Sequence, residues 1–566
     1  MSPDIDADID TGLEALSRGK HQWPTVSIAE RLEHLERIRA AVVAAAPDWV
    51  AAAVRAKGIP ESSPLAGEEW LSGPYAVLSW IAAVNETLRA IDSGADPLAG
   101  LPIRQRADGQ TIVRTSPHGL ADHLLLNGFS TEVWMEPGVT PANLRASLAA
   151  RYREPHEGAV ALVLGAGNIA SIPALDVLYK LFVDGEVVAL KMNPVNAHLG
   201  PVFERVFASL IDHRFLRCLY GGAEVGEYLC RHELVDTIQI TGSERTHDAI
   251  VYGSGAEGRA RRERDVRVVD KPITSELGGV GPTIVVPGPW TAADFRFQAE
   301  QIVTQKLQNS GFNCIAAQVL VLPEGWDGTP QLLAAIRDVM REAPARPAYY
   351  PGAEDRRRAA VDHYPQAEEI ATRTLIVGVD AQDEKAYAFT EEFFAPVLAT
   401  TTLPAADPAA FLLAAVQFAN ETLHGTLGAN LVVHPRTAAR LGPALEDAVA
   451  ALRYGTVAVN TWTAFGYLAP RATWGAFPGH IHSDIQSGIG TVHNALMFDR
   501  PQKTVVRGPF RPFPRSVLNG ELATTPKPPW FVTNRTAAVT ARRLTAFAAD
   551  GRLRRLPGII AAAVRG

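Results

Sequence analysis

The segment GAVALVLGAGNIASIPALDVLYKLFVDGEVVALK, residues 158–191, decides the fold. Its two ends, GAVALVLG and EVVALK, are short apolar runs that are typical of buried strands. Between them apolar residues recur at helical spacing, and Gly185 stands where such a helix would end. A strand–helix–strand unit builds a parallel sheet, because parallel neighbours need a crossover connection. The segment therefore predicts an α/β fold.

The alternation of strands and helices continues on both sides of this segment. An amphipathic pattern with a capping box at Ser27 and Glu30 predicts a helix over 27–56. We interpret residues 158–286 as a doubly wound α/β domain and the chain after residue 286 as a second α/β region. Further helices are predicted near 197–211, 223–232 and 291–308, and strands at RCLY (217–220), DTIQI (236–240), VRVVD (266–270), TIVV (283–286), AAQVLVL (316–322), TLIVGV (374–379), APVLATTTL (395–403), NLVVH (430–434) and GTVAVN (455–460).

The composition excludes several classes of protein. With 47% hydrophobic and 20% charged residues, the 566-residue chain is an ordinary globular sequence, long enough for about three domains. A net charge of −7 argues against a nucleic-acid partner. Three cysteines without a CxxC predict neither a disulfide framework nor a zinc site. The acidic start, MSPDIDADIDTGLEAL, lacks signal-peptide features, and no run of 18 apolar residues occurs, so we expect a cytoplasmic protein.

Five stretches carry residues suited to chemistry. Asn168 and Gly242 each lie between a predicted strand and helix, where amides stabilise anions, and Lys191 ends a strand. Glu276 precedes two glycines in SELGGVGPTIV, and Cys314 lies in NSGFNCIAAQV. Each has a plainer interpretation: glycines that only make turns, a solvated lysine, a capping carboxylate, or a buried thiol that packs as a small hydrophobe.

Taken in order, these stretches resemble the aldehyde dehydrogenase superfamily, over roughly residues 20–510. The combination of ELGG, G-x-x-C and EE-x-F-x-P-V at these distances is specific. The motifs are GN at 167–168, Lys191, TGS at 241–243, ELGG at 276–279, G-x-x-C at 311–314, EEFFAPV at 391–397 and VNTWTAF at 459–465.

The resemblance implies an enzyme that oxidises a small-molecule aldehyde to a carboxylic acid with NAD or NADP. Cys314 would be the nucleophile that forms a thiohemiacetal and then a thioester. Asn168 and the backbone N–H of Cys314 would hold the oxyanion. Glu276 would be the base that activates water.

The resemblance also implies a cofactor site. Lys191 would contact the adenosine ribose, and Gly242 and Ser243 would approach the pyrophosphate. Glu392 would hold the nicotinamide ribose, with Phe394 beside it.

Several positions depart from the family pattern. An acid that favours NAD is replaced by Pro194, which leaves NADP open as cofactor. The second glycine of the phosphate turn is replaced by His247. Gly167, Phe312 and Val280 also stand where the family commonly has tryptophan, glutamine and lysine.

The implied architecture is a Rossmann-type cofactor domain, an α/β catalytic domain and a small oligomerisation element, in a homodimer or homotetramer. The predicted parts are an N-terminal helical part of the cofactor domain (1–121), an oligomerisation hairpin region (122–157), the dinucleotide-binding domain (158–286), the catalytic thiol domain (287–484), a return segment for oligomerisation (485–520) and a basic C-terminal tail (521–566).

The tail lies outside the resemblance. From residue 528 onward it carries seven arginines and one aspartate, a net charge of +6. A basic, apolar tail could contact an anionic membrane or another subunit, or it could pack on its own body as a helical appendage.

Two other functions stay open: an acylating or reducing enzyme that interconverts an acyl thioester and an aldehyde, and a non-catalytic relative that acts through its tail. In GHIHSD, residues 479–484, the alternation of His480, His482 and Asp484 could bind a metal. We interpret it as a polar loop and predict no metal.

Overall fold

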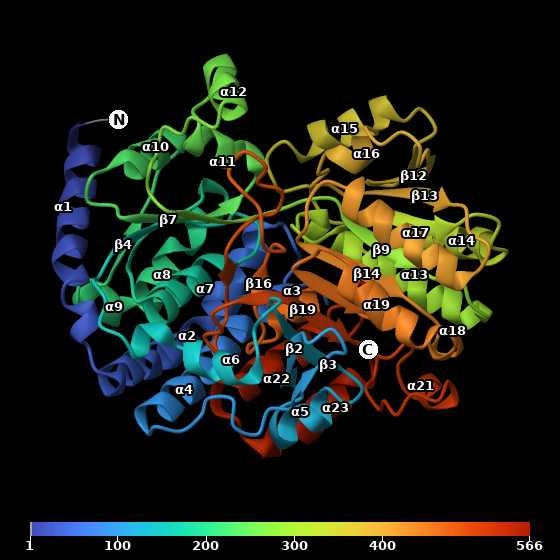
Figure 1. Cartoon of the computed structure of the whole chain (residues 1–566), viewed down its shortest axis with the longest axis horizontal. Helices are drawn as coiled ribbons and strands as arrows, with labels where there is room; N and C mark the ends of the chain where they lie inside the picture. The colour runs from blue at the N-terminus through green and yellow to red at the C-terminus, as the bar shows by residue number, and fades with distance from the viewer. Residues whose placement is uncertain (1–2) are drawn as a thin grey trace.

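A computed structural model describes residues 3–566 of the chain, with side chains from residue 7 onward. Residues 1 and 2 of the predicted N-terminal part lie outside it. Two sheets organise the molecule side by side, as Figure 1 shows. The segment 158–191 forms β4, α7 and β5 as predicted, with β4 and β5 parallel and paired from Val160 with Val187 to Leu164 with Lys191. The α/β prediction is confirmed.

The smaller sheet has six strands, all parallel except β17 at one edge. Its order is β17 (Gly488–Ile489), β8 (Ile273–Leu277), β7 (Thr237–Gly242), β4 (Val160–Leu164), β5 (Val187–Lys191) and β6 (Leu216–Leu219). Helices α7 (Ile172–Tyr179), α8 (Gly200–Val206), α9 (Ala208–Asp212), α10 (Ala223–Arg231), α11 (Glu244–Val251) and α12 (Gly255–Glu263) connect these strands.

The N-terminal helices pack against this sheet. They are α1 (Pro3–Lys20), α2 (Ile28–Ala56), α3 (Ala66–Trp70) and α4 (Ala76–Asp92). The predicted capping box is present at the start of α2, where Ser27 and Glu30 satisfy each other's backbone N–H groups. On the buried face of α2, the Trp49 ring packs against the ring of Phe203 in α8, with 5.0 Å between the ring centroids. This contact fixes α2 against the sheet layer.

The larger sheet has eleven strands and a parallel centre. Its order is β1 (Ile103–Gln105), β2 (Thr111–Ser116), β3 (Ser130–Met135), β19 (Pro501–Arg507), β15 (Thr456–Val459), β14 (Gly428–Val432), β9 (Gly281–Val285), β10 (Ala317–Pro323), β13 (Val397–Leu403), β12 (Arg373–Val379) and β11 (Glu368–Ile370). The helices of this half are α5 (Gly119–Leu125), α6 (Pro141–Ser147), α13 (Ala292–Leu307), α14 (Gly328–Glu342), α15 (Ala353–His363), α16 (Tyr387–Thr390), α17 (Pro408–Glu421), α18 (Pro435–Leu441), α19 (Pro443–Ala451) and α20 (Ala464–Leu468). Strands β16 (Trp474–Gly475) and β18 (Thr491–Val492) form a separate pair.

One strand prediction between 158 and 286 is wrong, and a second strand, confirmed as such, joins the other sheet. The run VRVVD is not a strand: Val266 is 50% exposed whereas Val269 is buried, so its apolar residues do not cover one core, and the strand begins only after Pro272. The run TIVV lies largely in β9, which pairs with β10 and β14 in the larger sheet. The chain therefore crosses between the sheets at residues 278–280, ahead of the predicted domain boundary.

The predicted oligomerisation element continues the larger sheet within its own chain. Strand β19 pairs in parallel with β15 on one side and antiparallel with β3 on the other. Both edges of β19 are therefore occupied by strands of the same protomer. Oligomerisation through these segments stays a prediction.

The basic tail packs on the body of the chain, which matches the helical-appendage alternative. After α21 (Arg515–Leu518), helix α22 (Ala537–Asp550) lies beside the N-terminal helices, and helix α23 (Leu556–Ala563) lies beside α5 in Figure 1. The approach of α22 to α3 is close, since a Cβ on Gly67 would lie 2.6 Å from the carbonyl carbon of Ala537. From residue 3 to residue 566, no helix combines the length and the apolar character that a membrane span requires. Membrane contact by the tail stays a prediction.

Candidate active site

A cleft of about 1240 Å³ runs along the carboxyl ends of the strands of the smaller sheet and reaches into the larger half. Ligands of open α/β sheets bind at this edge. All the residues predicted for catalysis and cofactor binding line this one cleft: Cys314, Glu276, Asn168, Lys191, Gly242, Ser243, Glu392 and Phe394. They come from segments that are up to 226 positions apart in sequence, so only the fold brings them together.

Cys314 lies on the loop that joins α13 to β10, directly after a tight turn over Gln308–Gly311. Its side chain is partly exposed to the cleft. Burial, followed by the charge and hydrogen bonding of Glu276, raises the pKa of the Cys314 thiol well above its ordinary value. The resting thiol is therefore protonated and lies next to a carboxyl group that can take its proton.

Glu276 occupies the carboxyl end of β8 and is 3% exposed. Burial raises the pKa of its carboxyl group, and the nearby Trp474 indole and Cys314 thiol lower it by smaller amounts. Among the described residues, no group forms a hydrogen bond of ordinary geometry with its Oε1 atom. A buried carboxyl oxygen without a partner is suited to bind water or substrate at the thiol.

The two glycines after Glu276 allow close approach of other segments. A Cβ on Gly278 would lie 2.1 Å from Oε1 of Glu392, and a Cβ on Gly279 would lie 2.9 Å from Cα of Gly425. Side chains at these positions would displace Glu392 or the loop at Gly425. The ELGG motif therefore has a packing reason as well as a chemical one.

Asn168 lies on the loop between β4 and α7 and is 6% exposed. Its Nδ2 donates to the backbone oxygen of Phe312 at 3.0 Å, two residues before the thiol. An amide nitrogen carries two N–H groups, so this bond leaves one of them to donate elsewhere. The contact also ties the Asn168 loop to the Cys314 loop.

Lys191, Gly242 and Ser243 line the cleft where strands β5 and β7 end. Lys191 ends β5 and is 8% exposed, and burial lowers the pKa of its amine. Ser243 is the N-cap of α11, since its hydroxyl accepts a hydrogen bond from the backbone N–H of Thr246 at 3.3 Å. This cap holds the helix terminus toward the cleft, where the helix dipole favours a negative charge.

Glu392 and Phe394 follow α16 on the larger half. Burial raises the pKa of the Glu392 carboxyl to about 8, although the charges of Lys306 and Arg356 oppose the shift. Its Oε1 is buried and has no hydrogen-bond partner within residues 3–566. The Phe394 ring lies 5.7 Å from that of Phe312, which connects this wall to the thiol loop.

Sequence reasoning missed a buried group behind Glu276. Asp176 of α7 is 1% exposed, and burial, followed by the charge of Glu276, raises the pKa of its carboxyl group to about 8. Thr241, which pairs with Glu276 across β7 and β8, donates to Asp176 at 3.1 Å. The signal in the sequence was an acid inside the apolar run IPALDVLY.

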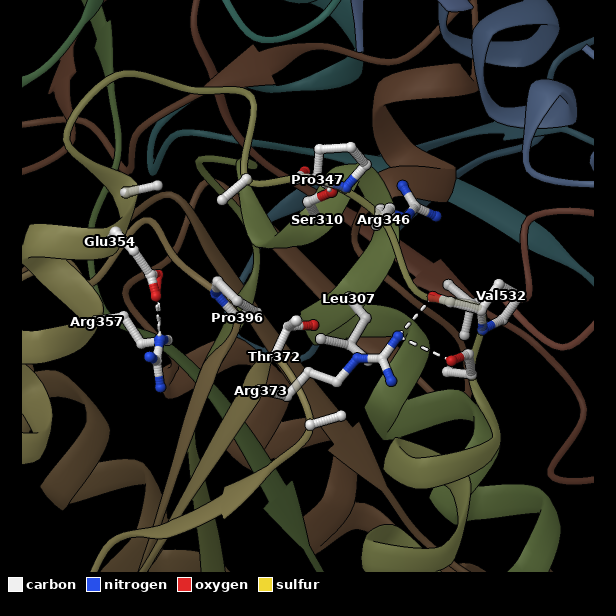
Figure 2. A pocket seen from close by; sticks show the side chains of 15 residues that line it. Leu307, Ser310, Arg346, Pro347, Glu354, Arg357, Thr372, Arg373, Pro396 and Val532 are labelled. Carbon is white, nitrogen blue, oxygen red and sulfur yellow. Dashed lines mark hydrogen bonds and ion pairs between the residues drawn. The ribbon is translucent and has the colours of Figure 1, made fainter. Parts of the chain in front are cut away.

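A second cavity, of about 300 Å³, lies on the far side of the thiol loop, where Ser310 and Leu307 form part of its wall (Figure 2). Its three arginines are already paired: Arg346 with Glu68, Arg357 with Glu354 and Glu369, and Arg373 with backbone oxygens of Met340, Ala343 and Pro344. Because these pairings occupy all three arginines, the cavity does not form an anion-binding site.

The histidines of GHIHSD bond to other side chains. His482 lies 3.1 Å from His247, and His480 lies 2.8 Å from the hydroxyl of Thr426. Over the described part of the chain, no group of three or more histidine, cysteine, aspartate or glutamate residues could hold a metal ion.

A thiol, a carboxyl and an amide group line one cleft at the carboxyl edge of the smaller, mainly parallel sheet. The model of the aldehyde dehydrogenase family matches residues 135–475, more than half of the chain. The chain belongs to the aldehyde dehydrogenase family.

Curated relatives match a shorter stretch. An N-succinylglutamate 5-semialdehyde dehydrogenase of Caulobacter vibrioides is 31% identical over 195 residues, which cover 34% of this chain and 37% of the relative. A coniferyl aldehyde dehydrogenase of a Pseudomonas species is 28% identical over 191 residues, 34% of this chain and 36% of the relative. The chain thus aligns with little more than a third of the length of each.

Solved structures match the fold over most of the chain. The substrate-bound AldH of Staphylococcus aureus has a TM-score of 0.57 at 17% identity, and the match covers 88% of this chain and 93% of that one. Lactaldehyde dehydrogenase from Escherichia coli has a TM-score of 0.57 at 17% identity, with 88% and 90% covered. These likenesses concern the fold alone.

Proposed function

We propose that the protein oxidises an aldehyde to a carboxylic acid with NAD or NADP, through covalent intermediates on Cys314. The observation that carries this proposal is the convergence of Cys314, Glu276 and Asn168 in a single cleft. The family membership supports it, as do the relatives whose names specify aldehyde oxidation.

The residues of the cleft fit a dinucleotide. Gly242 precedes the start of α11 and leaves room there, because a Cβ on it would meet only Ile240, at 3.8 Å, among the described residues. Lys191 supplies an amine, and the unpaired oxygen of Glu392 supplies an acceptor for ribose hydroxyls. We infer that these residues hold NAD or NADP, which when bound accepts the hydride of the oxidation.

The first half of the reaction uses the thiol. Glu276, next to Cys314, takes the thiol proton as Sγ attacks the carbonyl carbon, and a C–S bond forms while the π electrons move to oxygen. The remaining N–H of Asn168 and the backbone N–H of Cys314 stabilise that oxyanion. Loss of the hydride restores the C=O bond and leaves a thioester on Cys314.

The second half uses the carboxylate. Glu276 first releases the thiol proton to solvent, and its carboxylate then accepts a proton from water while the water oxygen attacks the thioester carbon. The C–S bond breaks, the acid leaves, and the proton on Glu276 returns to the Cys314 thiolate, which restores the resting thiol. Burial of Glu276 raises its pKa, which makes it a stronger base than an exposed glutamate.

The test is the absorbance of reduced nicotinamide, followed with aliphatic and aromatic aldehydes, with NAD or NADP, and with and without coenzyme A. Reduction without coenzyme A supports the proposal and identifies the cofactor. Reduction only with coenzyme A would assign the protein to the acylating enzymes instead. Absence of reduction in every combination would contradict the proposal.

We expect Glu392→Gln to raise the KM for the cofactor by about tenfold and to change the KM for the aldehyde little, because the amide nitrogen can only donate where the second carboxyl oxygen can also accept a hydrogen bond. Steady-state kinetics with each substrate varied in turn measure both constants. The matched control is Glu391→Gln, which makes the same carboxyl-to-amide change at the exposed neighbouring residue. Equal effects of the two changes would mean that Glu392 makes no specific contact with the cofactor.

A further inference from the structure

A buried lysine lies beneath the oxyanion loop. Lys57 is the C-cap of α2, and its side chain is 4% exposed. Its ammonium group donates to Glu69 at 2.7 Å, to the backbone oxygen of Asn168 at 3.1 Å and to Oδ1 of Asn309 at 3.0 Å. Burial lowers the pKa of Lys57, but the charge and hydrogen bond of Glu69, together with the charge of Glu68, more than offset this and raise it, so the amine is protonated. Its three N–H groups are thus matched to three acceptors.

Asn309 links Lys57 to the thiol loop through hydrogen bonds. It has a left-handed backbone, with φ of 52°, and Ser310 follows with φ of 58°. Its Nδ2 donates at 3.0 Å to the backbone oxygens of both Asn168 and Phe312. The oxygen of Phe312 also accepts the Asn168 side chain. The amide that would hold the oxyanion and the loop that carries Cys314 therefore share one set of hydrogen bonds.

Glu68 and Tyr349 complete the set. Glu68 accepts the backbone N–H of Asn309 at 2.9 Å and pairs with the buried Arg346 at 2.6 and 2.8 Å. The Tyr349 hydroxyl donates to the backbone oxygen of Asn168 at 3.1 Å. Figure 2 shows Arg346 beside Ser310 at the wall of the smaller cavity.

Helix α22 of the tail packs against the helix that carries two of these residues. Glu68 and Glu69 belong to α3, whose Gly67 abuts the first residue of α22. A chain of contacts thus leads from α22 through α3 to the Asn168 loop. Two consecutive left-handed residues without glycine are strained, and they persist only where the surroundings fix them.

We propose that Lys57 is a positioning residue that, together with Asn309, fixes the Asn168 amide and the Cys314 loop in the geometry needed for oxyanion stabilisation. This inference rests on the proposed function. Removing the ammonium group leaves three buried acceptors without their shared hydrogen-bond donor, which is costly. These acceptors are the Glu69 carboxylate, Oδ1 of Asn309 and the backbone oxygen of Asn168. The two loops would then separate or tilt, and a shift of about 1 Å is enough to weaken catalysis.

The test is Lys57→Met, which keeps the length of the side chain and removes the charge. We expect kcat for aldehyde oxidation to fall by about 10- to 100-fold, since misplacing one oxyanion donor costs less than deleting it. The KM values for aldehyde and cofactor should change by less than about threefold, because Lys57 does not line the cleft. Rates are expressed per Cys314 thiol, titrated by alkylation of the folded fraction isolated by size-exclusion chromatography, so that unfolded protein does not count.

A double-mutant cycle with Asn168→Ala separates positioning from mere stability. Asn168→Ala alone should lower kcat by about 10²- to 10³-fold. If Lys57 acts through Asn168, adding Lys57→Met should cost little more. The milder Tyr349→Phe, which removes one donor to the same carbonyl, should lower kcat by several-fold with the same non-additivity and replaces Lys57→Met if that variant does not fold.

The matched control is Lys180→Met. Lys180 is also 4% exposed and pairs with Asp184 at 2.8 Å and Glu186 at 3.1 Å, away from the thiol loop. It should lose thermal stability but keep its kcat per thiol. Wild-type kcat per thiol in both Lys57→Met and Tyr349→Phe, or full additivity with Asn168→Ala, would overturn the inference and leave the proposed function intact. Absence of turnover in the wild-type protein would overturn both.

Discussion

Replacing Cys314 with alanine should lower aldehyde oxidation to the detection limit, a loss of about 10⁴-fold or more, because no covalent intermediate can form. The thiol lines the cleft next to Glu276, and the substitution removes only one sulfur atom from a partly exposed loop position. Thermal stability and cofactor binding should therefore stay close to those of the unmodified protein. Reduced-nicotinamide absorbance and a thermal melt measure the two properties.

The matched control for this prediction is Cys230→Ala. Cys230 lines the same cleft, and burial raises the pKa of its thiol to about 12, so it is not a nucleophile at neutral pH. Activity should survive this change. Retained turnover in Cys314→Ala would mean that another group attacks the aldehyde.

The second large effect is expected for Glu276→Gln. The amide cannot take a proton from water, so steady-state turnover should fall by about 10²- to 10⁴-fold. Oxidation precedes hydrolysis, so a burst of about one reduced nicotinamide per active site should remain, slower than normal because Glu276 also contacts the Cys314 thiol. Stopped-flow absorbance separates the burst from the steady state.

Hydroxylamine gives a rescue experiment for the same variant. It attacks a thioester without help from a base, so it should restore repeated turnover in Glu276→Gln. Turnover that stays absent, together with no burst, would place the role of Glu276 before the oxidation, in activating the thiol alone.

The pH dependence of hydrolysis is set by the environment of Glu276. Burial raises the pKa of this carboxyl above its ordinary 4.5, and only the ionised form is a base. Hydrolysis should therefore increase as pH rises through the raised pKa and be lost below it. A rate midpoint at or below 4.5 would show that Glu276 is not the titrating base.

The sequence was sufficient for the elements of both sheets that have strong local signals. The run at 158–191, the capping box at Ser27 and most of the apolar strands were predicted because hydrophobic periodicity and capping or turn residues are local properties of the sequence. The same signals do not say which sheet a strand joins. TIVV looks like its neighbours, yet two glycines after Glu276 let the chain cross to the larger sheet, and pairing is a long-range property.

The candidate site residues that stand in sequence motifs could be predicted. The residues that hold them in place could not. Cys314 and Glu276 stand in recognisable stretches, and the structure gathers them with the other expected residues in one cleft. Lys57 has no such signal: it is a lysine at the end of an amphipathic helix, where solvent exposure is the usual outcome. Its partners come from three other segments, so its role becomes visible only from the packed structure.

The central claim is that an aldehyde is oxidised while covalently bound to Cys314, and intact-protein mass spectrometry of Glu276→Gln tests it most directly. After mixing with an aldehyde substrate and the cofactor, the account predicts an adduct with the mass of the aldehyde less two hydrogen atoms, located by peptide mapping on Cys314. An adduct of the full aldehyde mass would mean that oxidation does not follow attachment. An adduct on another residue, or none during a measured burst, would contradict the account.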